Sequence, residues 1–308
     1  MKGRPKLSAP LQGVIVAAVT PRRAEQHSID LGATLELIDF LASSGAHAIA
    51  LLGPAGEFVH FALDDRRHMV TFAAKRSRVP LLINVSHSTL DGAVELAREA
   101  ASAGAAALLL MPPHYYRYGA DAIRTFYLAF AAAVGQAAPI YIGNAPRFTN
   151  ELPPALAAEL LASGFFAGIV DASGDVDAFQ FLAQRAGQTR FTLLGGEERI
   201  YVAARRMGAA GVVSSAACPV PELMLALETA IREGVEERVR RLEARLIEFL
   251  DWIESFPPAA AVKEAAKQRG VKAGVVGAPL GQQDDYRLGQ FREWFRTWLP
   301  AVLRDCQR

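Results

Sequence analysis

Eight short apolar segments recur along most of the chain and constrain its fold more than any other feature. Amphipathic stretches of helical period separate them; in one of these, Leu35, Ile38 and Leu41 share a face. Segments that are apolar on both faces are typical of buried parallel strands. The eight segments are 13–20, 46–53, 80–86, 105–111, 138–143, 165–171, 190–195 and 210–216. We therefore predict an α/β fold, a closed (β/α)8 TIM barrel.

The main alternative to this barrel is an open, doubly wound sheet, and the sequence after the first strand argues against it. Such sheets usually carry a glycine-rich phosphate turn at that point, whereas this chain has VTPRR at 19–23. We therefore expect no nucleotide cofactor, and no other motif in the sequence indicates a cofactor. Helix boundaries are also marked, by Asp30 and Pro153-Pro154 at helix starts and by Gly45 and Gly104 at helix ends.

From about Arg232 the strand pattern stops and only helical periods follow. Helices are predicted over 234–254, 258–269 and 286–304. In the last of them one stripe is aromatic, formed by Phe291, Trp294, Phe295 and Trp298. Stripes at helical spacing usually pack, so we expect this one to contact the barrel or a partner subunit rather than a ligand. The predicted organisation is a barrel over 1–232 and a C-terminal helical extension over 233–308.

Composition excludes several classes of protein. With 51% hydrophobic and 21% charged residues, the 308-residue chain has the balance of a globular protein. Its net charge of +1 gives no attraction to nucleic acid or to an anionic membrane. No apolar run approaches the ~20 residues that span a bilayer, and the first residues lack the features of a signal peptide. The two cysteines, Cys218 and Cys306, form no disulfide framework or metal motif, so we expect a cytoplasmic protein.

Seven motifs, in order along the chain, resemble those of the dihydrodipicolinate synthase/N-acetylneuraminate lyase family. They are VTP (19–21), GPAGE (53–57), PPHYY (112–116), GNAP (143–146), GIVDASGD (168–175), GGEE (195–198) and GVVSS (211–215). The resemblance runs from about Gly13 to Leu280. It implies a (β/α)8 barrel with a helical extension, assembled as a homotetramer, that acts as a class I aldolase on pyruvate or a related 2-oxo acid.

The chain departs from this family at the residues on which the chemistry depends. The resemblance places Val170 where the family has its Schiff-base lysine, and Gly143 where it has the proton-shuttling tyrosine of YNxP. The two threonines that bind the carboxylate and pass a proton are replaced by Pro54 and Ala55. Tyr141 lies two positions earlier in the strand, about 6–7 Å deeper at ~3.3 Å per residue, and cannot take the place of that tyrosine.

Another lysine would have to replace the missing nucleophile. The chain has six lysines, and none falls in a predicted strand or in a loop that follows one: Lys2, Lys6, Lys75, Lys263, Lys267 and Lys272. A nucleophilic lysine must be desolvated at the barrel mouth so that it is uncharged near neutral pH. We therefore expect no imine catalysis.

A polar rim nevertheless remains at the carboxyl ends of the strands, where barrels of this kind build their active sites. The residues expected to line it are Thr20, Glu57, His87, His114, Tyr116, Asn144, Val170, Glu197 and Ser215. Glu57 could be a general base, but a structural carboxylate that caps backbone N–H groups is favoured. Asp171 should point away from the barrel interior and be structural. His87, His114 and Glu197 could ligate a metal, although their spacing does not support it.

Three functions remain open. The favoured one is a diverged barrel without imine chemistry, which binds a small carboxylate as a pseudoenzyme or catalyses a different reaction. The others are a working lyase or synthase acting on a 2-oxo acid, and a metal-assisted aldolase or hydratase that uses His87. In each case we expect a homo-oligomer, a dimer of dimers, that pairs Tyr115 and Tyr116 across the dimer, as the resemblance implies.

Overall fold

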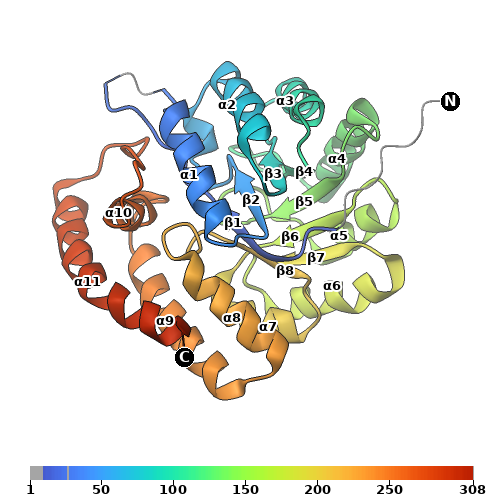
Figure 1. Cartoon of the computed structure of the whole chain (residues 1–308). Helices are drawn as coiled ribbons and strands as arrows, with labels where there is room; N and C mark the ends of the chain where they lie inside the picture. Colours follow the sequence, from blue (N-terminus) through green and yellow to red (C-terminus); the bar gives the residue numbers. More distant parts are fainter. Residues whose placement is uncertain (1–9, 26–27, 308) are drawn as a thin grey trace. The chain divides into compact units, whose positions relative to one another are not determined.

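In the computed structural model, which describes residues 10–25 and 28–307, eight parallel strands follow one another in chain order and close into a barrel (Figure 1). Each predicted apolar segment overlaps one strand, so the sequence prediction of a TIM barrel is confirmed. The strands are β1 (Gly13–Ala17), β2 (Ala48–Leu51), β3 (Leu81–Asn84), β4 (Ala107–Leu110), β5 (Ile140–Asn144), β6 (Gly168–Asp171), β7 (Thr192–Gly195) and β8 (Gly211–Ser214).

A helix follows every strand. The barrel helices are α1 (Leu31–Ser43), α2 (Leu63–Arg76), α3 (Leu90–Ala103), α4 (Ala120–Val134), α5 (Pro154–Ala162), α6 (Val176–Thr189), α7 (Tyr201–Arg206) and α8 (Pro221–Glu233). Short 3-10 turns η1 (Phe58–His60) and η2 (Glu198–Ile200) precede α2 and α7. Three further helices end the chain: α9 (Glu236–Ile253), α10 (Ala260–Gln268) and α11 (Gln282–Gln307). The predicted C-terminal helical extension is therefore present.

The helix boundaries follow the local signals of the sequence. The side chain of Asp30 accepts a hydrogen bond from the Ala33 N–H and caps α1. Pro154 is the first residue of α5, where its missing N–H costs nothing. Gly104 ends α3 with a φ of 95°, a left-handed conformation that glycine adopts without steric cost. These three signals were read correctly.

The chain divides into two compact units, and the first comprises Pro80–Val213 with the residues up to Gly13. It holds the continuous ladder from β3 to β8 and helices α3 to α7. In this ladder Gly143 of β5 pairs with Val170 of β6, and Asn144 pairs with Asp171. The register thus brings side by side the two positions to which the resemblance assigns the family's tyrosine and lysine.

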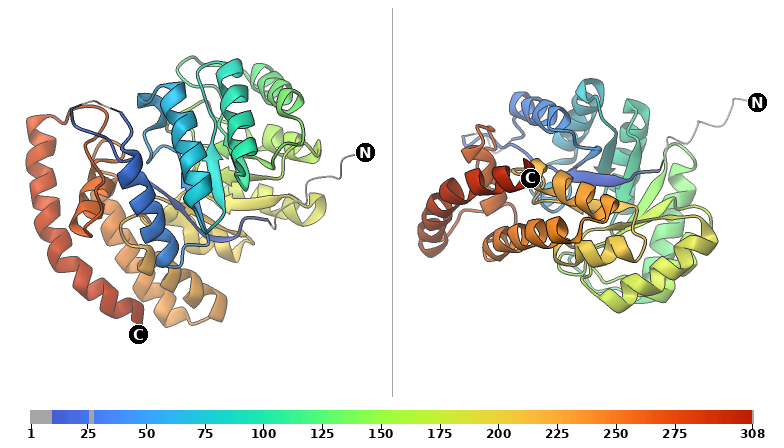
Figure 2. Two further views of the ribbon diagram at one scale, coloured as in Figure 1. Left: turned by 45° about the horizontal axis from the view of Figure 1, so that its top comes forward. Right: turned by 60° about the horizontal axis from the view of Figure 1, so that its bottom comes forward.

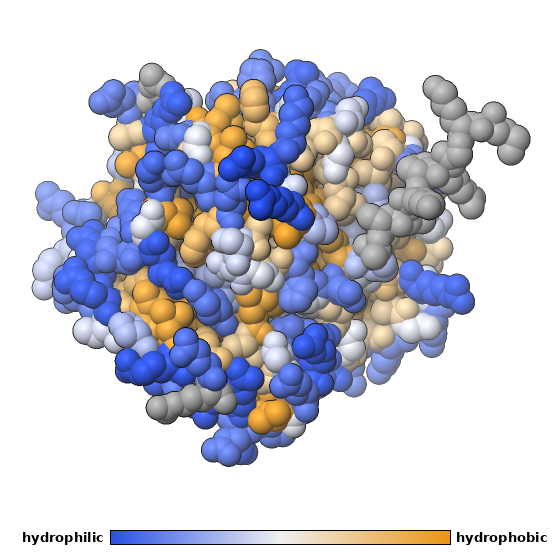
Figure 3. Space-filling view, viewed as in Figure 1, coloured by the Kyte–Doolittle hydropathy of each residue, from blue (hydrophilic) through white to orange (hydrophobic). Residues whose placement is uncertain are grey.

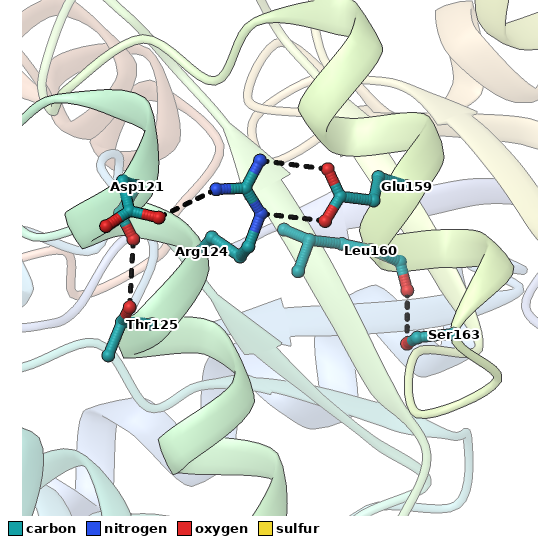
Figure 4. A network of polar contacts seen from close by, with 6 residues as sticks. All are labelled: Asp121, Arg124, Thr125, Glu159, Leu160 and Ser163. Carbon is teal, nitrogen blue, oxygen red and sulfur yellow. Dashed lines mark hydrogen bonds and ion pairs between the residues drawn. The ribbon is translucent and has the colours of Figure 1, made fainter.

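An arginine joins neighbouring helices of this first unit. Arg124 of α4 donates from Nε and Nη2 to the two carboxylate oxygens of Glu159 of α5, at 2.7 and 3.0 Å (Figure 4). Its Nη1 also bonds to Asp121, one turn earlier in α4. The guanidinium lowers the pKa of the Glu159 carboxyl, mainly through its hydrogen bond. Because all three side chains are partly or largely exposed, this network adds more to helix alignment than to stability.

The second unit comprises Val14–Val79 and Ser214–Arg308, two segments far apart in the sequence. It contains the β1–β2 ladder, α1, α2 and the four helices from α8 onward. Figure 2 shows α11 running beside α9 and α10, the same helices that it contacts. The predicted aromatic stripe of α11 packs on Phe249 and Trp252 of α9; the Phe249 and Trp298 rings, for example, stack at 5.4 Å. The stripe therefore packs, as expected, and the Phe249 and Trp252 rings that it meets belong to α9 of the extension itself rather than to the barrel or a partner subunit.

Hydrophilic side chains cover most of the face drawn in Figure 3, with smaller hydrophobic areas between them. Among the residues that the structure describes, no helix is both long enough and apolar enough to cross a membrane.

Candidate functional site

The first unit is apolar where the family's imine chemistry would take place. Val170 is 6% exposed, and its Cγ1 would lie 3.1 Å from a Cβ built on Gly196. A Cβ built on Gly143 would lie 2.8 Å from Cγ of Met111 and 3.2 Å from Cδ1 of Leu109. The first atom of any side chain at position 143 would thus meet two hydrocarbon side chains.

Tyr141 makes its hydrogen bond away from the carboxyl ends of the strands. Its ring is buried against Gly168, and its hydroxyl oxygen accepts a hydrogen bond from the N–H of Leu11 at 3.3 Å. Leu11 precedes β1, so the hydroxyl points toward the amino-terminal side of the strands. Barrels of this kind build their active sites on the opposite side, at the carboxyl ends of the strands. The expectation that Tyr141 cannot take over the proton shuttle agrees with this geometry.

Asn144 and Asp171 form a buried polar pair behind these strand ends. Asn144 Nδ2 donates to Asp171 Oδ1 at 2.7 Å, and its Oδ1 accepts from the N–H of Leu152 at 3.1 Å. The Ser173 hydroxyl donates to Asp171 Oδ2 at 3.0 Å. Burial raises the pKa of the Asp171 carboxyl, and these hydrogen bonds partly oppose the shift. Because each side chain makes two hydrogen bonds to neighbouring groups, the pair ties the ends of β5 and β6 together.

Local hydrogen bonds hold two of the three side chains considered as metal ligands. Nδ1 of His87 accepts from the Thr89 N–H at 3.1 Å, and its ring packs against Gly92 in the first turn of α3. Glu197 accepts from the N–H of Arg199 at 3.2 Å and caps η2. His114 is half-buried. Within residues 10–25 and 28–307, no three His, Cys, Asp or Glu side chains are grouped to hold a metal ion.

The loop after β4 presents an exposed aromatic surface. Tyr115 and Tyr116 are 88% and 65% exposed, and their rings meet edge to face at 4.9 Å. Asn150, which the sequence analysis did not single out, shapes this loop: its Nδ2 donates to the carbonyls of Pro113 and Tyr116 at 2.6 and 2.7 Å. The aromatic pair is therefore held on a defined backbone.

The second unit contains a buried ion pair. Lys263 of α10 is 1% exposed, and its Nζ lies 2.5 Å from Glu57 Oε2 and donates to the Val275 carbonyl at 2.7 Å. Glu57 Oε1 accepts from the N–H of Gly277 at 2.6 Å. The structure thus supports the structural interpretation of Glu57, although its partners are distant in sequence rather than neighbouring N–H groups.

Lys263 lies outside the strands and the loops that follow them, as expected, but it is desolvated. Burial lowers the pKa of its ammonium group, and the carboxylate of Glu57 opposes that shift. The sequence signal was present: Lys263 stands with one glutamate in a run of alanine and valine, AAAVKEAA at 259–266. Because the amine is closed in by Glu57 and Val275, however, it is not presented as a nucleophile.

The remaining rim residues of this unit lie around the turn that follows β2. The N–H of Glu57 bonds to the carbonyl of Pro54 at 3.0 Å, so Pro54-Ala55 close a tight turn without offering a hydroxyl group. Thr20 is fully buried, and its Oγ1 would lie 3.1 Å from a Cβ built on Gly56. Ser215 follows β8 and is partly exposed. Of the predicted rim residues in this unit, Thr20 and Glu57 thus flank one turn.

Comparison with known proteins agrees with the architecture. Residues 10–295 match the model of the dihydrodipicolinate synthetase family. An uncharacterized DapA-like lyase of Halobacterium salinarum is 32% identical over 89% of this chain and 90% of its own. A 4-hydroxy-tetrahydrodipicolinate synthase of Methanoculleus marisnigri is 28% identical over 92% of this chain and 97% of its own.

Solved structures share the fold. The sialic acid aldolase of Ruminococcus gnavus superposes with a TM-score of 0.85 at 22% identity, covering 94% of this chain and 99% of that one. Dihydrodipicolinate synthase of Aquifex aeolicus gives 0.86 at 24% identity, covering 94% and 98%. The family-model match spans nearly all of the barrel and most of the helical extension. The chain therefore belongs to the dihydrodipicolinate synthetase family.

Proposed function

We propose that this protein is a diverged member of its family that binds a small carboxylate at the carboxyl ends of its strands without forming an imine. The observation that carries the proposal is the hydrocarbon environment of the imine position, where Val170 stands beside Gly143 and where Met111 and Leu109 fill the tyrosine's space. A covalent route needs an amine there. Val170 and Gly143 offer neither an amine nor a hydroxyl group at these two positions.

The pseudoenzyme and altered-chemistry versions of this proposal share one requirement, which is binding without covalent attachment. The test is to incubate the protein with pyruvate and sodium borohydride, and then to measure intact mass and map any modified peptide. We expect no stoichiometric adduct on any lysine. An adduct on a single lysine at full occupancy would overturn the proposal and restore the alternative of a working lyase or synthase.

A gain-of-function variant sharpens this test. Val170→Lys should at most restore slow imine formation, because the tyrosine and threonine functions remain absent. Val170→Met is the matched control, since it adds a long side chain without an amine. Rapid condensation of pyruvate with an aldehyde by Val170→Lys would contradict the view that Gly143, Pro54 and Ala55 disable proton transfer and carboxylate binding.

We further propose that the chain assembles as a dimer of dimers through the Tyr115–Tyr116 loops. The exposed pair supports this, since large aromatic side chains are enriched at interfaces. Light scattering at micromolar concentration should give the mass of a tetramer. Tyr115→Ser with Tyr116→Ser should lower that mass, and Tyr286→Ser, an exposed tyrosine of α11, is the control. A monomeric wild type would refute the assembly.

Two free cysteines fit the cytoplasmic location that we also propose.

A further inference from the structure

Arg22 is a buried cation with unused hydrogen-bond donors. It follows β1, is 9% exposed, and its guanidinium carbon lies 5.1 Å from the centre of the Phe61 ring. Within the described part of the chain, its Nε and Nη1 are buried and have no hydrogen-bond partner. A buried guanidinium without an acceptor is costly, because it has given up water without replacing it. Buried polar groups of this kind are nearly always hydrogen-bonded, so we expect Arg22 to have an acceptor that the described residues do not supply.

Thr20, two residues earlier, repeats the pattern. Its side chain is fully buried, and among the described residues its hydroxyl has no hydrogen-bond partner. The hydroxyl oxygen lies against Gly56, beside the Pro54-Ala55 turn. The segment after β2 therefore contacts both side chains: Gly56 lies against Thr20, and Phe61 lies against Arg22.

The charges around Arg22 do not balance. Lys263 Nζ lies 2.5 Å from Glu57 Oε2, so these two charges neutralise each other. The positive charge of Arg22 is then not neutralised. No ion pair joins Arg22 to a carboxylate of the residues that the structure describes. Arg22 is close enough to Lys263 to contribute to lowering the pKa of that lysine. Three charged side chains of one unit thus carry a net single positive charge with little access to solvent.

We propose that Arg22 and Thr20 bind the carboxylate of a small monoanionic acid. The inference rests on the proposed function and deepens it: these two side chains provide the carboxylate-binding groups that Pro54 and Ala55 lack. A guanidinium matches carboxylate oxygens in charge and geometry, and the hydroxyl adds a donor. A single negative charge neutralises the cluster, whereas a phosphate dianion would leave a buried negative charge.

The test measures pyruvate binding by calorimetry and by thermal unfolding, at constant ionic strength maintained with potassium chloride. For the wild type we expect a saturable heat of binding and a melting temperature that rises with pyruvate. Arg22→Met should weaken binding by about 10- to 100-fold, since it removes charge-assisted hydrogen bonds. Thr20→Val, which removes only the hydroxyl, should weaken it by about 5- to 10-fold.

Two further variants keep the test decisive. Arg23→Met changes the exposed neighbouring arginine and should leave pyruvate binding as in the wild type. Arg22→Lys keeps the charge but loses the fork of donors, so it should bind with intermediate affinity and tests the site if Arg22→Met does not fold. Without pyruvate, Arg22→Met should melt no lower than the wild type, because it removes an uncompensated charge.

The outcomes separate the two proposals. Unchanged pyruvate affinity in Arg22→Met or Arg22→Lys would overturn the assignment of Arg22, while the absence of a borohydride adduct would still support the proposed function. An equal response to chloride and pyruvate would identify an adventitious ion only, and no response of the wild type would indicate trapped water; both overturn the carboxylate site. A borohydride adduct on a lysine would overturn the proposed function whatever the affinity of Arg22→Met.

Discussion

Two regions of the molecule differ in what they bury. The strand ends around Val170 in the first unit bury hydrocarbon, whereas the cluster around Lys263 in the second unit buries charge. Near Val170 the side chains are hydrocarbon, and Met111 and Leu109 lie against Gly143. Near Lys263 charges are kept in the interior, where an ion pair and two backbone contacts hold Lys263 and Glu57. The like charge of Arg22 instead disfavours the charged form of Lys263. The first region thus buries hydrocarbon where the second buries charge, and the two regions differ in what a substitution should cost.

The largest effect should follow from breaking the buried pair. Lys263→Met leaves Glu57 charged and unpaired in the interior, which we expect to lower the free energy of unfolding by about 3–5 kcal/mol. Denaturant unfolding measures it. Lys267→Met, on the same helix but with a side chain 42% exposed, should cost less than about 1 kcal/mol.

A double variant distinguishes the pair from general packing. Glu57→Gln with Lys263→Met removes both charges and should recover much of the loss, because no uncompensated charge remains. Equal destabilisation by Lys263→Met and Lys267→Met would show that the pair is not the stabilising contact of this region.

The next effect tests whether the tyrosine's space is truly filled. Gly143→Tyr should destabilise the protein by about 1–3 kcal/mol, because its Cβ alone would meet Met111 and Leu109. Combining it with Met111→Ala should cost less than the sum of the two single changes, as measured by denaturant unfolding in a double-mutant cycle. Additive costs would mean that Met111 does not occupy that space.

The sequence was sufficient for the barrel, whereas the loss of imine chemistry stays a prediction. Buried strands appear as apolar runs whatever their neighbours are, and the motif around Val170 fixes its register. The sequence did not reveal that Lys263 and Arg22 are buried, because the burial of a charged side chain depends on residues far along the chain. Glu57 meets Gly277 across 220 residues, a pairing that no local period can reveal. Asn150 was missed for the same reason, since it shapes a loop 34 residues earlier.

A smaller effect concerns pH in the first unit. Burial raises the pKa of the Asp171 carboxyl in the folded protein above the ~3.9 of an unfolded chain, so folding favours the neutral acid. The contribution of this group to stability is therefore fully present below pH ~3.9. The contribution is lost as pH rises through the folded pKa. The stability of the wild type relative to Asp171→Asn should therefore fall with increasing pH above about 4, as followed by urea unfolding. The exposed Asp177→Asn is the control, and a difference that grows with pH would reverse the assigned shift.

The smallest effect is expected at a thiol of the second unit. Cys218 is fully buried, and burial raises the pKa of its thiol to about 11. In a Cys306→Ala background, iodoacetamide at pH 8 should leave the folded protein unlabelled, and should label it once it is unfolded. Fast labelling of the folded protein would show an activated thiol, and the charged cluster would then contain a nucleophile.

The bond from the Gly277 N–H to Glu57 has a consequence for how the chain is made. The second unit consists of an early and a late segment, and Glu57 belongs to the early one. During synthesis, therefore, the carboxylate stays in water until α10 and the segment behind it have left the ribosome. A nascent chain that stops before Ala260 lacks both Lys263 and Gly277, so the turn after β2 has no ion-pair partner. Premature termination there should yield a protease-sensitive product even though all eight barrel strands have already been translated.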